Sequence, residues 1–174
     1  PVQKAAIPAV LLIILMALFY YKDSVLEFFN NNKGISLAEV SVYRNDEIEL
    51  DEIEKFDKIL LSPGPGIPDE AGLLKSIILK YATSKSILGV CLGQQAICEV
   101  FGGSIINLEK VHHGIATNID IIVDDEILFQ DLEKNIAVGR YHSWVVNPLN
   151  FPDVLEITSI DTNSQIMSLR HKTY

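Results

Sequence analysis

Gly89-Val90-Cys91-Leu92-Gly93-Gln94-Gln95 is the stretch of sequence that decides the fold. An apolar run, 86–90, leads into a cysteine with glycine two positions before it and two after, and a helical pattern starts at Gln95. This pattern predicts a strand, a sharp turn and a helix with a thiol at the apex, the form of a nucleophile elbow with cysteine in place of serine. The glycines are needed because the apex backbone is strained and larger flanking side chains would collide.

The position of Cys91 predicts a reactive thiol. A thiol at a helix N-terminus faces the positive end of the helix dipole, so we expect a lowered pKa and a larger thiolate fraction. A lone cysteine is more often a small buried apolar residue. Glycines on both sides and the amide of Gln95 favour the functional interpretation here.

Length, charge and cysteine content restrict the class of protein. The 174 residues suffice for one domain, and the net charge of −9 without a Lys/Arg cluster argues against nucleic acid and anionic membranes as partners. Cys91 and Cys98 are too close on one turn and helix to pair, so we expect a reducing, cytoplasmic location. There is no CxxC or HExxH pattern, so we expect no metal site and no cofactor.

Residues 1–22 form an atypical apolar leader, with no charge between Ala5 and Tyr21. Three interpretations stay open: the first strand of a parallel sheet with an irregular leader, a signal or membrane anchor, and a segment foreign to the domain. We favour the strand, and we expect no membrane association.

Residues 23–174 alternate between helical and extended patterns. Helices are expected at 23–32, 49–56 and 69–81, and strands at 38–43 and 58–62. From Ser104 on, the chain is richer in strands, at 119–123, 136–141, 154–159 and 165–170, with a hairpin turn at 161–164. This order predicts an α/β fold: a flavodoxin-like, mostly parallel sheet with helices on both faces.

A Pro-Gly-Pro-Gly loop, 63–66, follows the strand at 58–62, just as Cys91 follows the strand at 86–90. Loops at the carboxyl ends of parallel strands form the ligand sites of such sheets. Backbone N–H groups of this loop and of Leu92 are then placed to hold an oxyanion, while the Cys91 thiolate attacks a carbonyl and forms a thioester. Taken alone, the loop is more simply a rigid turn.

Four motifs in this order carry a family resemblance: residues 61–68, residues 88–97, Phe101-Gly102-Gly103 and Arg140-Tyr141-His142-Ser143. From about residue 42 to its end, the chain resembles the class I (triad-type) glutamine amidotransferases. Within them it is most similar to the glutaminase subunits of anthranilate synthase and of aminodeoxychorismate synthase. The resemblance implies that glutamine is hydrolysed to glutamate and that ammonia passes to a chorismate-binding partner, anthranilate synthase component I.

The resemblance also implies the site residues. Cys91 matches the nucleophile, and the backbones of Gly66 and Leu92 match the oxyanion hole. The implied substrate contacts are Gly64, Pro65, Gly66, Gln95, Ser143 and Trp144. His112-His113-Gly114 resembles a loop that helps to signal between subunits.

One family element is missing from the sequence. Relatives carry their catalytic base in a Val-Gln-Phe-His-Pro-Glu segment after the strand that matches 166–171, and this sequence ends at Tyr174. The four histidines present are expected to be structural or on the surface. We therefore expect a truncated amidotransferase domain, 23–174, without glutaminase activity of its own.

Other functions remain open at this point. The role in anthranilate and tryptophan synthesis is favoured over the equivalent role in folate synthesis. A catalytically dead interaction subunit, a different cysteine hydrolase and a membrane-anchored form are the remaining alternatives.

Overall fold

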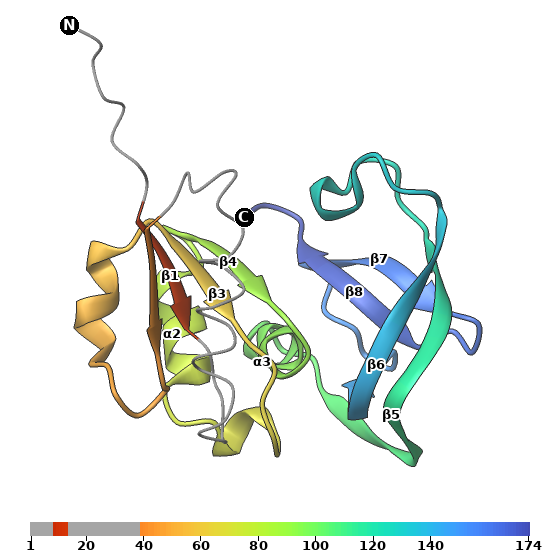
Figure 1. The fold of residues 1–174 in the computed structure, drawn as a ribbon, viewed down its shortest axis with the longest axis horizontal. Helices are drawn as coiled ribbons and strands as arrows, with labels where there is room; N and C mark the ends of the chain where they lie inside the picture. Colours follow the sequence, from red (N-terminus) through yellow and green to blue (C-terminus); the bar gives the residue numbers. More distant parts are fainter. Residues whose placement is uncertain (1–8, 14–38) are drawn as a thin grey trace, which may run out of the picture. The chain divides into compact units, whose positions relative to one another are not determined.

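The computed structural model describes residues 9–13 and 39–174 of the chain (Figure 1). The chain divides into two compact units, 1–96 and 97–174, here called the elbow unit and the barrel unit. Each unit is described by itself. The expected helix at 23–32 and most of the apolar leader lie outside the described residues, and the expected domain limits stay a prediction.

The elbow unit is built on a four-stranded parallel sheet. Its strands are β1 (Ala9–Ile13), β2 (Glu39–Tyr43), β3 (Lys58–Leu61) and β4 (Ser86–Gly89). The order β2-β1-β3-β4 places β1, from the apolar leader, in the interior of the sheet (Figure 1). All three strand pairs are parallel, which confirms the α/β fold class.

Two short 3₁₀ helices and one α-helix accompany this sheet: η1 (Leu50–Lys55), η2 (Pro68–Glu70) and α2 (Leu74–Tyr81). A capping box between Glu49 and Glu52 starts η1. The single helix expected over 69–81 is interrupted at Gly72, whose φ of +54° is incompatible with a continuous helix. The core of the unit includes Ile53, Ile59, Leu61, Leu74, Ile77, Ile78 and Tyr81.

The barrel unit is antiparallel. Its strands are β5 (Ile105–Ile121), β6 (Asn135–Val146), β7 (Leu155–Asp161) and β8 (Ile166–His171), with η3 (Ile127–Phe129) between β5 and β6. The strands close into a barrel in the order β5-β6-β8-β7 (Figure 1). The expected turn at 161–164 joins β7 to β8, with the Ser164 N–H donating to the Asp161 carbonyl at 2.9 Å.

Two expectations for β5 need correction. The strand begins at Ile105, well before the expected 119–123, because most of its side chains are exposed and leave no regular apolar alternation. His112 and His113 lie within this strand, not in a loop. Gly114, with φ +69°, marks an irregularity in the pairing of β5 with β6 between His113 and Ile115.

The helix after the elbow, α3 (Leu92–Val100), ends at the start of the barrel unit. Its Cys98 packs in an apolar cluster with Val146, Leu155 and Ile166. A Cβ atom on Gly103 would lie 2.4 Å from the Cys98 sulfur, so only glycine allows this close approach. Burial raises the pKa of the Cys98 thiol to about 11, so it is an inert core thiol.

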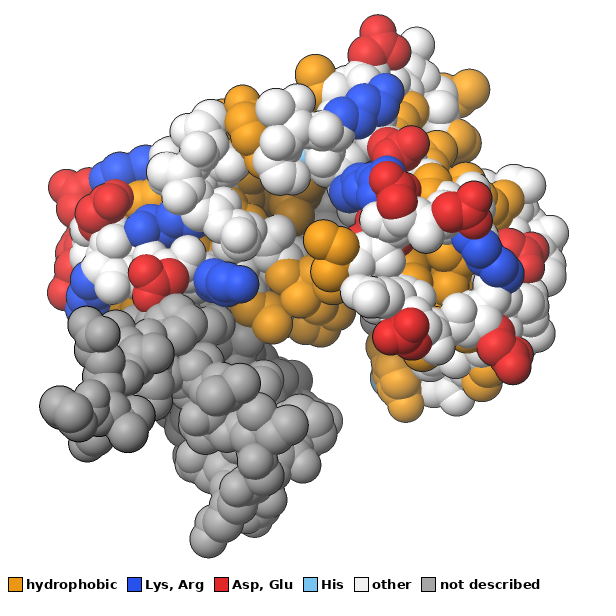
Figure 2. All heavy atoms as spheres, turned by 90° about the horizontal axis from the view of Figure 1, so that it is seen from above, with side chains coloured by type: hydrophobic (Ala, Val, Ile, Leu, Met, Phe, Trp, Pro, Cys, Tyr) orange, Lys and Arg blue, Asp and Glu red, His pale blue; other side chains and the backbone are white. Residues whose placement is uncertain are grey.

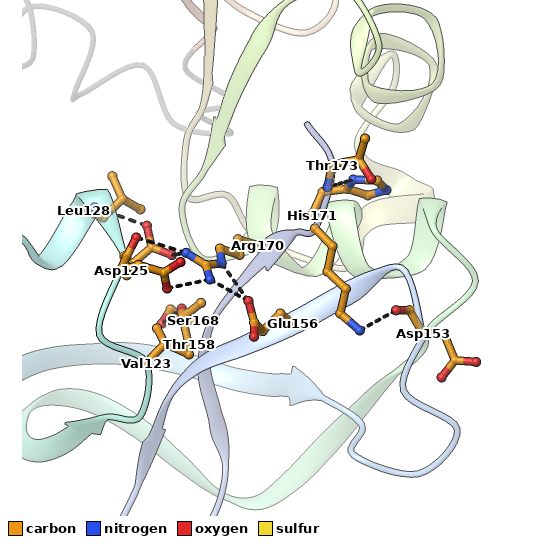
Figure 3. A network of polar contacts seen from close by, with 12 residues as sticks. Val123, Asp125, Leu128, Asp153, Glu156, Thr158, Ser168, Arg170, His171 and Thr173 are labelled. Carbon is orange, nitrogen blue, oxygen red and sulfur yellow. Dashed lines mark hydrogen bonds and ion pairs between the residues drawn. The ribbon is translucent and has the colours of Figure 1, made fainter.

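An arginine ties the segment after β5 to the β7–β8 hairpin. Arg170 on β8 donates to Asp125 Oδ1 and to Glu156 Oε2, each at 2.8 Å (Figure 3). On the same strands the hydroxyl of Ser168 lies within hydrogen-bond distance of those of Thr158 and Ser159. These contacts join the C-terminal strand β8 to β7 and to the segment after β5.

The surface carries charges of both signs. On the face drawn in Figure 2, Lys and Arg side chains are interspersed with Asp and Glu rather than gathered in a patch of one sign. Among the described residues, no helix has both the length and the apolar content required to cross a membrane.

Candidate active site

Cys91 occupies a strained turn between β4 and α3. Its φ is +54°, a backbone value that residues other than glycine rarely adopt. The flanking glycines are sterically required: a Cβ on Gly89 would lie 2.5 Å from the Gly93 carbonyl carbon, and a Cβ on Gly93 would lie 2.5 Å from the Leu61 carbonyl oxygen. The strand–turn–helix geometry expected from the glycine spacing is therefore confirmed.

Backbone hydrogen bonds hold the elbow against the sheet. The Val90 N–H donates to the Leu61 carbonyl of the neighbouring strand at 2.8 Å. The Gln95 N–H donates to the Cys91 carbonyl at 3.0 Å, which starts α3 directly after the cysteine. Cys91 thus sits at the N-terminus of a helix of nine residues, as the sequence predicts.

The protonation state of Cys91 differs from the expectation. Burial raises the pKa of the Cys91 thiol, and a hydrogen bond from the Leu92 backbone N–H acts in the opposite direction without cancelling it. The expected lowering was wrong because desolvation of a thiolate outweighs the donors at the helix N-terminus. At neutral pH the thiol stays protonated, and a nucleophilic role requires a base.

No base of the usual kind lies in the elbow unit. Residues 1–96 contain no histidine, and all four histidines of the sequence belong to the barrel unit. A histidine that removes the thiol proton would therefore have to come from outside residues 1–96.

The Pro-Gly-Pro-Gly loop starts at the same edge of the sheet as the elbow. β3 and β4 are neighbours in the register Leu61↔Gly89, so residues 62–66 and the turn at Cys91 leave adjacent strands at the same level. Gly66 has φ +73°, which a residue with a side chain would adopt only with strain. This confirms the predicted adjacency of the two strands and brings both loops to one edge.

The remaining predicted substrate contacts lie on two elements. Gln95 is buried on α3, one turn after Cys91. Ser143 and Trp144 lie half-buried on β6 of the barrel unit. The structure therefore brings the elbow, the glycine loop and Gln95 together in one unit, and describes the Ser143–Trp144 pair in the other.

A buried polar network on β6 was not anticipated from the sequence. Arg140, 1% exposed, donates from Nη1 to Asp161 Oδ2 at 2.6 Å and from Nε to His142 Nε2 at 3.0 Å. Its Nη2 atom also donates to the side-chain oxygen of Gln165. Two features of the sequence could have indicated this network. Arg140 lies within the alternating strand pattern at 136–141, and the acidic residue Asp161 begins the turn at 161–164.

The described residues offer no evident metal centre. Within 9–13 and 39–174, no three or more His, Cys, Asp or Glu side chains are grouped so that they could hold a metal ion. Both cysteines are free thiols.

The fold and the elbow define an α/β protein with a candidate thiol nucleophile beside a glycine-rich loop. The model of the family "Glutamine amidotransferase class-I" matches residues 18–174. The chain belongs to this family.

Curated relatives are about 40% identical to the chain over the matched residues. It is 44% identical over 138 residues to anthranilate synthase component 2 of Porphyra purpurea, covering 78% of this chain and 72% of that protein. It is 41% identical over 139 residues to aminodeoxychorismate synthase component 2 of Escherichia coli, covering 79% and 73%. The chain spans only 23% of the bifunctional protein TrpGD of Thermotoga maritima, to which it is 39% identical over 139 residues, or 79% of its own length.

Solved structures support the fold. A glutamine amido transferase from Methylobacillus flagellatus superimposes with a TM-score of 0.72 at 16% identity, over 97% of this chain and 67% of that one. At this identity the likeness concerns the fold alone.

Proposed function

We propose that this chain is the glutaminase part of a chorismate-using synthase, which hydrolyses L-glutamine to glutamate and ammonia. The observation that carries the proposal is Cys91 at φ +54° on a glycine-flanked elbow, next to the glycine loop that leaves the adjacent strand. Family membership supports the choice of an amide as substrate. The absence of a disulfide between the two free cysteines agrees with a reducing cytoplasm.

The proposed reaction has two halves. The Cys91 sulfur, as its proton leaves to a base, attacks the side-chain carbonyl carbon of glutamine. The backbone N–H groups of Gly66 and Leu92 are proposed to hold the oxyanion. The amide nitrogen takes up a proton and departs as ammonia, which leaves a γ-glutamyl thioester on Cys91. Water then attacks the thioester, releasing glutamate and restoring the thiol.

The proposed acceptor of the ammonia is a partner subunit that binds chorismate, and the proposed product is anthranilate. Aminodeoxychorismate is the second candidate, because relatives named for each synthase match the chain at 44% and 41% identity. Both reactions require the same half-reaction of the glutaminase. Co-purification with each type of synthase subunit, followed by identification of the aminated product, separates the two.

We also propose that the polypeptide of residues 1–174 by itself releases negligible glutamate. The raised pKa of Cys91 demands a base, and the family resemblance assigns that role to a histidine in a segment that these residues do not include. Glutamate release by the purified polypeptide, lost on Cys91→Ala substitution, would contradict this proposal.

Labelling with a glutamine-like chloroketone tests the nucleophile. Modification should fall on Cys91 and be slowed by L-glutamine, because the reagent carries the amino-acid end of the substrate. Cys98→Ala is the matched control and should label like the wild type, since the Cys98 thiol is buried and its pKa is raised to about 11. Peptide mapping that finds the adduct on Cys98 would refute the assignment.

A further inference from the structure

The loop between β5 and β6 presents apolar side chains to solvent. It covers residues 122–134 at one end of the barrel and includes η3 (Figure 1). Ile127 and Leu128 on η3 are 82% and 56% exposed, and Leu132, in the turn that follows, is 53% exposed. Single apolar residues on a surface are common, but three large ones so close in sequence form a patch, here called the loop tip.

The backbone of the loop tip is structured. The Phe129 N–H donates to the Glu126 carbonyl, and the Leu132 N–H donates to the Phe129 carbonyl, each at 3.1 Å. The side chain of Glu126 starts η3 by accepting from the Leu128 N–H at 3.2 Å. The exposed aliphatic side chains therefore belong to a hydrogen-bonded turn and not to an open stretch of chain.

Contacts with the barrel strands anchor the base of the loop. The Ile121 N–H donates to the Lys134 carbonyl at 2.7 Å, and the Ile122 N–H donates to the Thr158 carbonyl of β7 at 3.0 Å. From β8, Arg170 donates to the backbone carbonyl and to the side chain of Asp125, at 3.1 and 2.8 Å (Figure 3). A partner that binds a loop held in this way does not have to order it first, which lowers the entropic cost of binding.

Carboxylates accompany the loop tip. The loop contains five Asp and Glu residues and one basic residue, Lys134. Lys134 and Arg170 are both engaged in ion pairs with carboxylates of the loop. Asp131 and Glu133, on either side of Leu132, are exposed, and neither has an ion-pair partner in the part of the chain that the structure describes. The loop tip therefore lies beside uncompensated negative charge.

The combination of aliphatic and acidic side chains restricts the kind of partner. Exposed aliphatic side chains favour any contact that removes them from water. Carboxylates beside them repel the anionic headgroups of a membrane and the phosphates of nucleic acid. A second copy of this chain would bring a further net charge of −9 against the same loop. A protein segment with apolar side chains flanked by cations satisfies both requirements.

We propose that the loop tip, together with Asp131 and Glu133, is a docking site for another protein, through a segment of that protein in which apolar side chains are flanked by Lys and Arg. The apolar side chains of the segment cover the three aliphatic side chains of the loop tip, and its cations pair with the two carboxylates. The site lies within the barrel unit and does not depend on the chemistry proposed for Cys91.

Two labelled amphipathic peptides of about 14 residues provide the probe. Both carry the same leucine stripe at helical spacing, and the remaining positions are lysine in one peptide and glutamate in the other. Fluorescence anisotropy with the full chain gives each Kd. We expect the Leu/Lys peptide to bind at least about tenfold more tightly than the Leu/Glu peptide, by a margin that shrinks as salt is added. A photoreactive leucine in the Leu/Lys peptide should crosslink within residues 122–134.

An exposed aliphatic residue elsewhere in the barrel unit supplies the control for the apolar contact. Ile127→Ser should weaken binding of the Leu/Lys peptide by about tenfold, because one large apolar contact is lost. Leu149→Ser removes a side chain that is 71% exposed outside the loop and should stay within about twofold. Both side chains face solvent, so both variants should keep the thermal transition of the parent.

A second pair of variants tests the charges. Asp131→Asn with Glu133→Gln should weaken binding of the Leu/Lys peptide by about threefold at low salt. Asn tolerates the left-handed backbone of Asp131, at φ +64°, so the turn is kept. Glu109→Gln with Asp153→Asn removes two exposed carboxylates outside the loop and is the matched control.

Several outcomes would overturn the proposal. These are no measurable binding of the Leu/Lys peptide, equal binding of the two peptides, equal effects of Ile127→Ser and Leu149→Ser, and crosslinks outside residues 122–134. Flotation of the chain with phosphatidylcholine vesicles, lost in Ile127→Ser, would assign the loop tip to a membrane instead. A dimer in sedimentation that Ile127→Ser dissociates would assign it to a second copy of the chain.

Discussion

The elbow unit and the barrel unit obtain their chemistry in different ways. In the elbow unit the candidate site is made of backbone: a strained cysteine, two glycines at which a Cβ would lie 2.5 Å from neighbouring backbone, and N–H groups of two loops. In the barrel unit it is made of side chains, with buried Arg140 and Asp161 linked to half-buried His142. Backbone sites depend on sterics, and side-chain networks depend on partner groups distant in sequence. The following predictions test this contrast, from the largest expected effect to the smallest.

Removal of the buried arginine should have the largest effect. Arg140→Met leaves the Asp161 carboxylate buried without its partner, which should cost about 3–5 kcal/mol in free energy of unfolding. Adding Asp161→Asn should recover part of the loss, because no charge is then buried alone. Urea denaturation of the wild type, of Arg140→Met and of the double variant Arg140→Met/Asp161→Asn measures these free energies of unfolding. If Arg140→Met is as stable as the wild type, the Arg140 network contributes little to stability.

A methyl group at the elbow should have the next largest effect. Gly93→Ala places a Cβ 2.5 Å from the Leu61 carbonyl oxygen, so β3 and α3 must separate, and we expect a loss of about 2–3 kcal/mol. Gly139→Ala in the barrel unit is the matched control, since the atom nearest to its new Cβ would be a ring carbon of Tyr141 at 4.0 Å. We expect the control to change stability by less than about 0.5 kcal/mol. Equal effects at the two positions would remove the proposed difference between the units.

A buried ammonium in the elbow unit provides a smaller test. Lys85 Nζ donates to the carbonyls of Glu54 and Phe56 at 2.9 and 2.7 Å, and its side chain is 9% exposed. Lys85→Met should cost about 1–2 kcal/mol because two acceptors at the end of η1 lose their donor. Lys134→Met is the control: its ion pair with Asp124 is largely exposed and should matter little. Thermal unfolding of both variants measures the difference. A larger loss of stability in Lys134→Met than in Lys85→Met would contradict the prediction.

The mildest expected effect is a difference in pH dependence. The pKa values of His112, His142 and His171 are all lowered, mainly by burial, and all three belong to the barrel unit. The unfolded chain therefore takes up protons near pH 6.5 before the folded barrel does, so stability that is present above this pH is lost as the pH falls through it. Hydrogen exchange, corrected for intrinsic rates, should show the barrel unit loosening between pH 7 and pH 5.5.

The elbow unit is the internal reference for that experiment. Residues 1–96 contain no histidine, so exchange from its described strands and helices should change much less over the same pH interval. Equal loosening of both units would mean that the histidines do not control the response.

Sequence patterns anticipated the elbow unit better than the barrel unit. The strand before Cys91, the turn and the following helix were predicted because glycine spacing and apolar runs act locally. The interruption of the expected helix 69–81 at Gly72 was missed, since a single glycine is compatible with both a continuous and an interrupted helix. The 17-residue β5 was missed because its exposed, polar side chains carry no clear period.

The sequence by itself determined the nucleophile candidate, the glycine loop and the family, because these depend on residue types at short, fixed spacings. Tertiary structure alone decided two things: the raised pKa of Cys91 and the Arg140–Asp161–His142 network. Each of them depends on burial or on partners separated by many residues. Desolvation and long-range hydrogen bonding cannot be read from local sequence patterns, because they arise only once the strands have paired.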